Sequence, residues 1–466
     1  MIQQETIVAL ATPSGAGAIA IVRLSGLKAI EIAAEMFQSV SGKDLKQQKT
    51  HTVHLGNIQD GSRAIDQVLA TIFKNPYSYT GEDVVEFSCH GSSYIQQQII
   101  QFALNKGCRM AEAGEFTLRA FLNGKMDLSQ AEAVADLIAS DNAATHQIAM
   151  QQMRGGFSDE IQVLRQELLN FASLIELELD FSEEDVEFAN RDDFQELVSR
   201  ITTVLKRLID SFATGSVLKQ GIPVAIVGEP NVGKSTLLNA LLNEERAIVS
   251  DIAGTTRDSI EDELSIGGIG FRFIDTAGIR ETTDTIEGLG IQKTFEKMQK
   301  AQVVLYLLNS LKFAEEKQTI SELVQLRDRF PQKPFVVVCN KMDMLNDEQK
   351  DYLRTSLASI PESDIMEISA KQKIGLEELK NKLLEYVNTG ALRNNETIVT
   401  NSRHYDSLLN ALEEMIRVQE GIDMGLSGDL LAIDIRQALY HFGEITGEIT
   451  NDELLGNIFS QFCIGK

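Results

Sequence analysis

The segment 228–235, which reads GEPNVGKS, constrains this chain more than any other stretch. An apolar run at 223–227 precedes it, and leucines at helical spacing follow it. This order predicts a strand, a glycine-bounded loop and a helix, with the G-x-x-x-x-G-K-[ST] spacing of a phosphate-binding loop. Glycines let backbone N–H groups point inward at phosphate oxygens, and the helix N-terminus adds partial positive charge. Lys234 is then placed to reach the β- and γ-phosphates, and the Ser235 hydroxyl to bind Mg²⁺.

Three later segments, each after an apolar run expected to form a strand, narrow the nucleotide to GTP. In DTAG at 275–278, an acidic residue can hold Mg²⁺ through water and the glycine backbone can sense a γ-phosphate. In NKMD at 340–343, the Asp343 carboxylate can accept two guanine N–H groups that adenine does not offer. SAK at 369–371 would close over the base. Because an open α/β sheet binds ligands at the carboxyl ends of its strands, these segments predict a guanine-nucleotide domain over 216–384.

Composition places the chain among globular proteins with more than one domain. Its 466 residues suggest about two to four domains, and 43% apolar with 24% charged residues is typical of soluble proteins. Residues 1–10 show no signal sequence, and the most apolar run, 303–308, is too short to cross a bilayer. Four cysteines without C-x-x-C spacing suit a reducing compartment: Cys89, Cys108, Cys339 and Cys463. We therefore expect a cytoplasmic protein without a membrane span, which disfavours a transport GTPase.

The charge balance limits the possible partners. A formal net charge of −25 argues against a nucleic-acid-binding surface that covers the whole chain. A local basic patch remains open, although no dense run of Lys and Arg indicates one.

Residues 1–118 alternate strand-like runs with turns and predict a compact α+β domain. The expected elements are a helix at 29–37 and strands at 6–11, 19–24, 68–73 and 84–91. The segment Thr12–Gly17 has the composition of a hairpin turn, with a ligand loop as the alternative. Cys89 and His90 form a possible metal pair but lack further ligands at metal-site spacing.

From about Phe116 the pattern becomes helical. Apolar residues recur at helical spacing within 164–175 and 198–212, and further helices are expected at 402–420, 429–442 and 451–462. Thr450 and Glu453 have the spacing of a capping box before the last helix. The acidic segment 180–187 fits either a solvated turn or a cation site. Since domain termini commonly lie close together, 119–215 and 385–466 predict one all-α domain into which the nucleotide domain is inserted.

The nucleotide site departs from the Ras pattern at one position. Ras-like GTPases place a glutamine directly after D-T-A-G to orient the attacking water, and Ile279 stands there instead. Asn231 and carbonyls of the segment 250–258 offer a site for a monovalent cation in place of an arginine finger. A threonine of that segment can complete the Mg²⁺ shell, and Glu287 can position water if its stretch closes down. The residues alone leave these roles open.

The chain resembles the bacterial and organellar tRNA-modification GTPases of the MnmE family, also called TrmE, over essentially its whole length. Other GTPases share the central motifs but not the flanking ones. The resemblance rests on Thr6–Ala9, Ala11–Pro13, Phe116, Arg119–Lys125, Asp127–Ala133, Gly254–Asp258 and the tail Phe462–Lys466.

The resemblance implies a multidomain α/β and α+β protein. Its parts would be an N-terminal α+β domain that binds folate and dimerises, an all-α helical domain, and an inserted Ras-like P-loop G domain. It implies GTP hydrolysis that K⁺ stimulates through G-domain dimerisation. It also implies a homodimer that forms a heterotetramer with an FAD-dependent partner. Together they would act on tRNA, adding an aminomethyl or carboxymethylaminomethyl group at C5 of the wobble uridine with a folate-borne carbon.

The resemblance also implies roles for individual residues. Contacts to 5-formyl- or 5,10-methylene-tetrahydrofolate map onto Arg23, Glu86, Lys125 and Lys466. The potassium site maps onto Asn231, Ser250, Ile252 and Thr255, the Mg²⁺ ligands onto Ser235 and Thr256, and the water-positioning glutamate onto Glu287. The full expected GTP site is Asn231, Val232, Gly233, Lys234, Ser235, Thr236, Ser250, Asp251, Ile252, Ala253, Gly254, Thr255, Thr256, Asp275, Thr276, Ala277, Gly278, Asn340, Lys341, Asp343, Ser369, Ala370 and Lys371.

Two interpretations of the function remain at this point. In the first, the chain is one half of an RNA-modifying enzyme, with Lys234, Glu287 and Cys463 as catalytic residues. In the second, it is a regulatory or ribosome-assembly GTPase without one-carbon chemistry. A switch protein needs neither a thiol at Cys463 nor a pterin pocket, which favours the first. Cys463 itself is either a reactive thiol or a small apolar filler at a domain junction.

Overall fold

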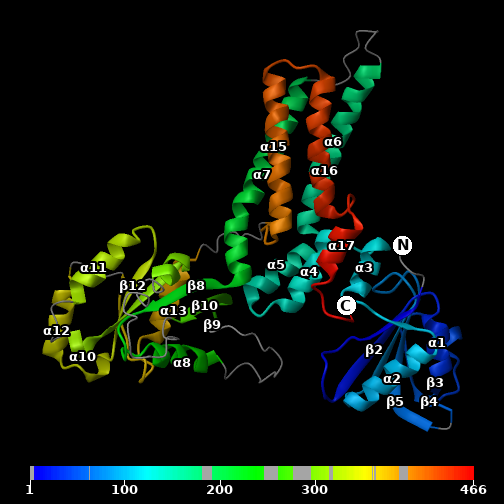
Figure 1. Cartoon of the computed structure of the whole chain (residues 1–466), viewed down its shortest axis with the longest axis horizontal. Coiled ribbons are helices and arrows are strands. Elements are labelled where there is room, and N and C mark those ends of the chain that lie inside the picture. Colours follow the sequence, from blue (N-terminus) through cyan, green and yellow to red (C-terminus); the bar gives the residue numbers. More distant parts are fainter. Residues whose placement is uncertain are drawn as a thin grey trace, which may run out of the picture. The chain divides into compact units, whose positions relative to one another are not determined.

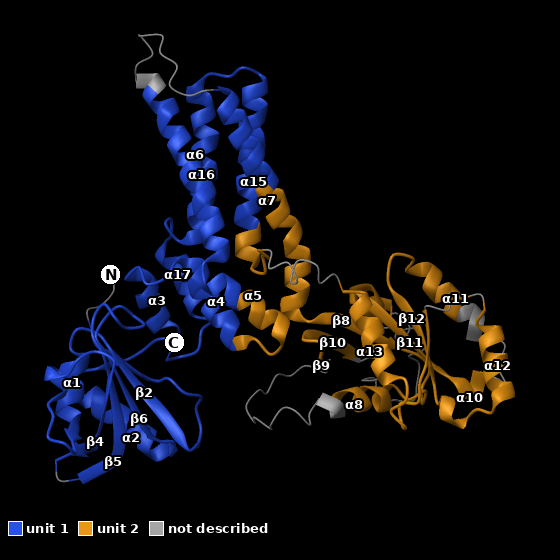
Figure 2. Cartoon of the chain, turned by 180° about the vertical axis from the view of Figure 1, so that it is seen from behind, with its two compact units in different colours: residues 1–138, 150–203, 406–466 blue, residues 139–149, 204–405 orange. Residues whose placement is uncertain are grey.

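The structure, a computed structural model, describes the residue ranges 5–61, 63–180, 191–245, 261–275, 295–313, 319–358, 360, 364–387 and 397–465. The chain, shown in Figure 1, divides into two compact units, which Figure 2 distinguishes by colour. The first unit comprises Met1–Ile138, Met150–Thr203 and Asp406–Lys466. The second comprises Ala139–Ala149 and Val204–Tyr405, so it interrupts the first in the sequence.

A seven-stranded sheet forms the amino-terminal part of the first unit, in the order β3-β4-β5-β6-β2-β1-β7. β1 and β7 are parallel, and the other neighbours are antiparallel. The strands are β1 (Ile7–Leu10), β2 (Ile19–Ser25), β3 (Phe37–Ser39), β4 (Thr52–Asp60), β5 (Arg63–Phe73), β6 (Val84–His90) and β7 (Arg109–Met110).

One face of this sheet is covered by two helices, α1 (Ala29–Met36) and α2 (Ser93–Asn105) (Figure 1). Successive side chains of a strand point to opposite faces. Alternate residues of β2 and β6, such as Val22 and Phe87, are therefore buried in one core with residues of both helices. The predicted α+β fold, with its strands and first helix, is confirmed.

The loop between β1 and β2 connects an antiparallel hairpin, as its composition predicts. The Gly17 N–H donates to the Gly91 carbonyl at 2.9 Å, which fixes the loop against the end of β6. The neighbouring Cys89 and His90 do not form a metal site. His90 Nδ1 instead contacts Asp66 Oδ1 at 2.7 Å. Within the described ranges, no group of three or more His, Cys, Asp or Glu residues is arranged to hold a metal ion.

Helices make up the rest of the first unit and continue into the second. α6 and α16 pack closely. The Ile175 side chain on α6 lies only 2.9 Å from the position that a Cβ on Gly428 of α16 would occupy. Arg436 and Glu176 join the same two helices at 2.6 Å. The helices are α3 (Glu115–Leu122), α4 (Leu128–Ala139), α5 (Ala143–Met153), α6 (Gly156–Asp180), α7 (Arg191–Gln220), α15 (Ser402–Asp423), α16 (Gly428–Thr446) and α17 (Asp452–Phe459).

The helical periodicity is confirmed, whereas the predicted cap of the last helix is wrong. Residues expected to face a core, such as Leu168 and Leu205, are buried. The N-cap of α17 is Asn451 rather than Thr450, and its side chain accepts from the Leu454 N–H at 2.7 Å. Asn is as good an N-cap as Thr or better, so the start moves by one residue. In the described parts of the chain, no helix is long and apolar enough to span a membrane.

A six-stranded sheet forms the centre of the second unit, in the order β13-β12-β11-β8-β10-β9. All neighbours are parallel except β9 and β10. Apolar clusters fill both of its faces, which explains why β11 and β12 are continuous apolar runs. The strands are β8 (Ile222–Val227), β9 (Glu261–Ile266), β10 (Ile269–Asp275), β11 (Val303–Asn309), β12 (Phe335–Asn340) and β13 (Ile365–Glu367). The main helices are α8 (Lys234–Glu245), α11 (Thr319–Arg329), α12 (Asp347–Ser356) and α13 (Leu376–Glu385).

Candidate functional site

The predicted phosphate-binding loop connects β8 to α8, and its backbone requires the glycines. Gly228, Asn231 and Gly233 have φ values of 153°, 62° and 101°. A Cβ on Gly228 would lie 2.3 Å from the Leu307 carbonyl oxygen, and one on Gly233 would lie 2.5 Å from Asn340 Nδ2. A side chain at either position would therefore displace a neighbour and strain the loop.

The predicted phosphate- and Mg²⁺-binding side chains that follow this loop lie in the first turn of α8. Lys234 Nζ donates to the Gly228 and Glu229 carbonyls at 2.6 and 3.4 Å, which holds the ammonium group over the loop. Ser235 and Thr236 follow in the first turn, and both are exposed. The hydroxyl of Ser235 is thus placed at a helix N-terminus, where anions and their cations bind.

Asn340 joins the phosphate loop to the guanine motifs. Asn340 is the last residue of β12 and is only 3% exposed. Nδ2 donates to the Val232 carbonyl at 2.8 Å, and Oδ1 accepts from the N–H groups of Lys341 and Ala370 at 2.9 and 3.0 Å. Lys341, at φ 69°, donates from Nζ to the Asn231 carbonyl at 3.1 Å. Three predicted motifs distant in the sequence therefore meet at one buried amide.

The remaining residues that are predicted to bind the base follow the ends of β12 and β13. Asp343 is exposed in a short 3₁₀ turn, Met342–Met344, directly after β12. Ser369 is buried, and its Oγ accepts from the Gln372 N–H at 3.2 Å, which shapes the 369–371 turn. Lys371 is exposed. The Asp343 carboxylate is thus free of the core, at the strand end where a base would bind.

Part of the predicted site falls outside the described residues. β10 ends at Asp275, whose backbone alone is described. Outside the description lie all but the first residue of the acidic segment 180–187, and also Ser250, Asp251, Ile252, Ala253, Gly254, Thr255, Thr256, Thr276, Ala277, Gly278, Ile279, Glu287 and Lys466.

A second group of predicted residues meets in the first unit. Arg23 on β2 and Glu86 on β6 are cross-strand partners, and Arg23 Nε lies 2.7 Å from Glu86 Oε1. Their side chains are 20% and 22% exposed, so the pair is partly shielded from water. Arg23 Nη1 also donates to the Gly465 carbonyl at 3.4 Å. Its guanidinium carbon lies 5.7 Å from the ring centre of Tyr79 and 5.6 Å from that of Phe116, within cation–π range.

Lys125 reaches the same segment that carries Tyr79. Its Nζ donates to the Pro76 carbonyl at 3.0 Å. Asn123 Nδ2 donates to the Thr80 carbonyl at 2.7 Å, so the end of α3 is tied to this segment twice. Burial raises the pKa of the Tyr79 hydroxyl, while its bond to Thr117 and the nearby charge of Arg23 oppose the rise. The hydroxyl is therefore neutral at physiological pH.

Sequence reasoning missed Tyr79 and Gly465 as neighbours of the Arg23–Glu86 pair, and did not assign Phe116 there. Tyr79 is 56 residues from Arg23 in the sequence and Gly465 is 442 residues away. No local pattern links positions so far apart. An aromatic residue beside a cationic one becomes informative only after the strand order is known.

Cys463 differs from the other three cysteines. It is exposed, whereas Cys89, Cys108 and Cys339 are buried. Burial raises the pKa of Cys89 to about 11 and those of Cys108 and Cys339 to about 12, which makes these thiols unreactive. The Cys463 carbonyl accepts from the Gly114 N–H at 3.4 Å, which anchors the backbone. An exposed side chain does not fit the role of an apolar filler.

Comparisons with known proteins agree with this arrangement. The family profile of the MnmE helical domain matches residues 128–463, and that of the GTP-binding protein TrmE N-terminus matches residues 6–125. The chain belongs to the MnmE family. The tRNA modification GTPase MnmE of Christiangramia forsetii is 70% identical over 470 residues, which cover 99% of both chains. That of Flavobacterium johnsoniae is 68% identical over 467 residues and covers 100% of both, and that of Bacteroides fragilis is 54% identical over 470 residues, with 99% and 100% covered.

MnmE membership confirms the predicted fold class: an N-terminal TrmE domain, a helical domain and a Ras-like G domain. The profile of the helical domain covers both sides of the G-domain motifs, as expected for an insertion. Among solved structures, Era from Aquifex aeolicus is 28% identical and covers 41% of this chain and 66% of its own, with a TM-score of 0.28. The MnmE assignment rests on the sequence relatives.

Proposed function

We propose that this chain is a GTPase that acts in tRNA modification. Full-length MnmE relatives at 70% and 68% identity carry this proposal, since both are tRNA modification GTPases by name. The Asn340 amide supports the GTPase part, because it holds the phosphate loop and two guanine motifs together. By the same reasoning we assign the folate-binding and dimerisation domain to 1–118, the helical domain to 119–215 and 385–466, and the G domain to 216–384.

In the G domain, Lys234 contacts the β- and γ-phosphates and Asp343 accepts the guanine N–H groups. Ser235 and Thr256 bind Mg²⁺. Asn231, Ser250, Ile252 and Thr255 bind K⁺, which supplies positive charge beside the phosphates. The described residues fit these hard cations, because Asn231 and Ser235 present exposed oxygen-bearing side chains on either side of Gly233. Glu287 positions the attacking water, which Ile279 cannot do.

In the amino-terminal domain, Arg23, Glu86 and Lys125 bind a tetrahydrofolate derivative together with Lys466. The donor set fits such a ligand. Glu86 offers an acceptor to the donors of a pterin, and Arg23 and Lys125 offer charge to a ring carbonyl or a glutamate carboxylate. The partly shielded position of the Arg23–Glu86 pair strengthens such contacts relative to open water. Folate supplies the one-carbon unit that becomes part of the modified uridine.

The remaining assignments concern partners and location. The chain forms a homodimer and, with an FAD-dependent protein, a heterotetramer that acts on the C5 atom of the tRNA wobble uridine. The net charge of −25 is compatible with this, because the partner can supply basic surface for RNA. Cys463 takes part in one-carbon transfer or holds a reactive intermediate. The complex is cytoplasmic.

Modified-nucleoside analysis tests the proposal most directly. A strain that lacks this gene should lose C5-modified wobble uridine from its tRNA, and the wild-type gene should restore it. A gene with Lys234→Ala should not restore it. Unchanged tRNA in the deletion strain, together with GTP hydrolysis by the pure protein, would support a regulatory or ribosome-assembly GTPase instead.

A further inference from the structure

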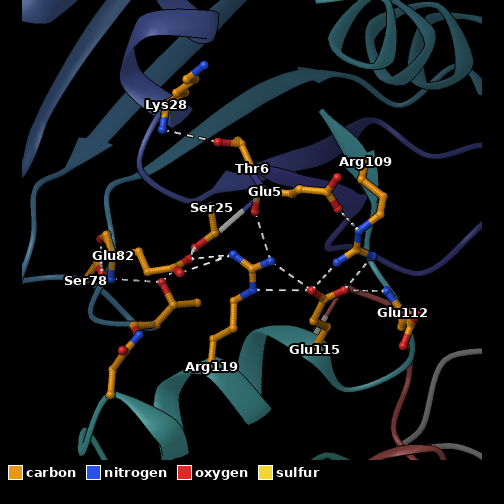
Figure 3. Close-up of polar contacts among 12 residues, drawn as sticks. Glu5, Thr6, Ser25, Lys28, Ser78, Glu82, Arg109, Glu112, Glu115 and Arg119 are labelled. Carbon is orange, nitrogen blue, oxygen red and sulfur yellow. Dashed lines mark hydrogen bonds and ion pairs between the residues drawn. The ribbon is translucent and has the colours of Figure 1, made fainter. Parts of the chain in front are cut away.

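A buried ion-pair network connects α3 to the segment that carries Tyr79. Arg119, on α3, is 1% exposed. Its guanidinium donates to both carboxylate oxygens of Glu82 at 3.1 and 3.0 Å, and twice to Glu115 Oε1 at 2.9 and 3.3 Å. It also donates to the Glu5 carbonyl at 3.0 Å, as Figure 3 shows. These contacts occupy a donor group that has five N–H bonds in a rigid fork.

One arm of the network fixes the segment around Glu82. Glu82 Oε2 accepts from Ser25 Oγ at 2.7 Å, at the end of β2. Ser25 Oγ lies 2.7 Å from Thr80 Oγ1, which accepts from the Glu82 N–H at 3.2 Å. Ser25 and Thr80 are fully buried. Glu82 is thus held from one side by β2 and from the other by Arg119.

The other arm reaches the surface through Glu115. Arg109 donates to its two carboxylate oxygens at 2.6 and 3.0 Å, and the Glu112 N–H donates at 2.9 Å. Arg109 is 31% exposed and also contacts Glu5 Oε2 at 3.0 Å. Arg109 bonds to Glu5, to the Met110 carbonyl and to Glu115, so this arm ties α3 to β7 and to the residues just before β1.

Stability alone is a poor explanation for such a network. Removing charges from water is unfavourable, and apolar side chains of similar volume often stabilise a core equally well. A rigid fork does provide fixed distances between the elements that it joins. Here those elements are α3, which carries Phe116, and the segment that carries Tyr79. A hydrogen bond between Tyr79 Oη and Thr117 Oγ1, at 2.9 Å, joins the same two elements.

We propose that Arg119 is a positioning residue for the Arg23–Glu86 site, acting through Glu82. The inference rests on the folate site proposed above. By fixing α3 against the Glu82 segment, Arg119 sets the spacing of the two aromatic rings that flank Arg23. The guanidinium of Arg23 then stays aligned with Glu86 before a ligand arrives. A preorganised site binds more tightly because less ordering is needed on binding.

The test is calorimetric titration of the pure full-length protein with 5-formyltetrahydrofolate. Glu82→Gln keeps the side-chain shape but removes the charge that pairs with Arg119. It should weaken folate binding by about tenfold or more, because the segment that carries Tyr79 is then less firmly fixed. Arg119→Met should do the same. Arg109→Met is the matched control, since it removes the same charge from the same Glu115 but leaves the Glu82 arm intact. Its folate affinity should stay close to that of the wild type, because the side-chain bonds of Arg109 go to Glu5, Met110 and Glu115 and none of these residues lies in the Tyr79 segment.

A local probe separates positioning from general stability. The chain contains no tryptophan, so Tyr79→Trp introduces a single indole into the site, which can be excited selectively at wavelengths where tyrosine does not absorb. In that background, Glu82→Gln should lower the fluorescence anisotropy of the indole, whereas Arg109→Met should not. This readout remains available if Arg119→Met does not fold.

The outcomes are distinguishable. Wild-type affinity in Glu82→Gln with unchanged anisotropy would overturn the role of Arg119. An equal loss of affinity in Arg109→Met would show that the whole network acts as a structural unit, which also overturns it. Absence of binding by the wild-type protein would instead overturn the proposed folate site.

Discussion

The side-chain nitrogen of Asn340 lies 2.8 Å from the carbonyl oxygen of Val232, across 108 residues of sequence. Both residues are buried, and the same amide also accepts from the Ala370 N–H. The position of the loop at 228–235 is therefore coupled to the 369–371 turn through one side chain.

Asn340→Ala should weaken both nucleotide binding and the fold of the second unit. It leaves the Val232 carbonyl and the Ala370 N–H buried without this partner, which costs about 1–3 kcal/mol. Calorimetry with GDP should show a corresponding fall in affinity, and thermal unfolding a lower midpoint. Asn346→Ala is the control: it removes the cap of α12, costing about 1 kcal/mol of stability, and should leave GDP affinity unchanged.

Asp343→Asn should lose affinity for GTP and gain affinity for xanthosine nucleotides. The amide can donate to the 2-oxo group of xanthine but cannot accept both guanine N–H groups. Sites built for such bonds discriminate by factors of about 10⁴–10⁵. Parallel titrations with GTP and XTP measure the change in affinity for each nucleotide. Unchanged GTP affinity would contradict the assignment of Asp343 to guanine binding.

GTP turnover should be faster in K⁺ than in Na⁺. Because Ile279 cannot orient water, hydrolysis should need both added charge and Glu287. An arginine finger contributes factors of about 10³–10⁵, which sets the scale for K⁺. Asn231→Ala should remove the K⁺ stimulation, and Glu287→Ala should slow turnover while sparing nucleotide binding. Equal rates of GTP hydrolysis in the two salts would rule out a catalytic role for bound K⁺.

Cys463 should be the first cysteine to react in the folded protein. The other three are buried thiols with raised pKa values, so mass spectrometry after brief alkylation at pH 8 should find label at Cys463. Cys463→Ser should leave GTP hydrolysis near normal and abolish tRNA modification. Normal modification in cells that carry only this variant would contradict a chemical role for the thiol.

The first unit should lose stability in acid because of Glu115. Burial opposes its ionisation, but bonds from Arg109, Glu112 and Arg119 outweigh this and hold the pKa of the carboxyl below 4.5. Its contribution is thus complete above pH 4.5 and is lost as the pH falls through the lower folded value. Glu115→Gln should destabilise the unit at neutral pH by about 3 kcal/mol and flatten this acid dependence. Denaturant unfolding at several pH values measures both. Glu377→Gln, which changes a carboxylate that is 73% exposed, should change neither.

The sequence predicted the G domain better than the amino-terminal site. The phosphate-loop motif and the guanine motifs are contiguous, and each follows an apolar strand, so the places of Lys234 and Asn340 at the ends of strands could be predicted. Arg119 was part of a recognised segment, but its partners Glu5 and Glu82 come from elsewhere in the chain. β4 was missed because polar residues interrupt it and because Gly56 makes room for the Phe37 ring, 2.2 Å from where a Cβ would lie.

The bond from Arg23 to the Gly465 carbonyl joins residues 442 positions apart, with Ile464 bridged to Ala113 beside it. A ribosome synthesises Arg23 well before Gly465. The strands of the sheet around Arg23 all lie before residue 111, whereas the bond to Gly465 requires that residue 465 has been made. A chain shortened before residue 465 would therefore retain every strand of this sheet but lack the carbonyl that accepts from Arg23.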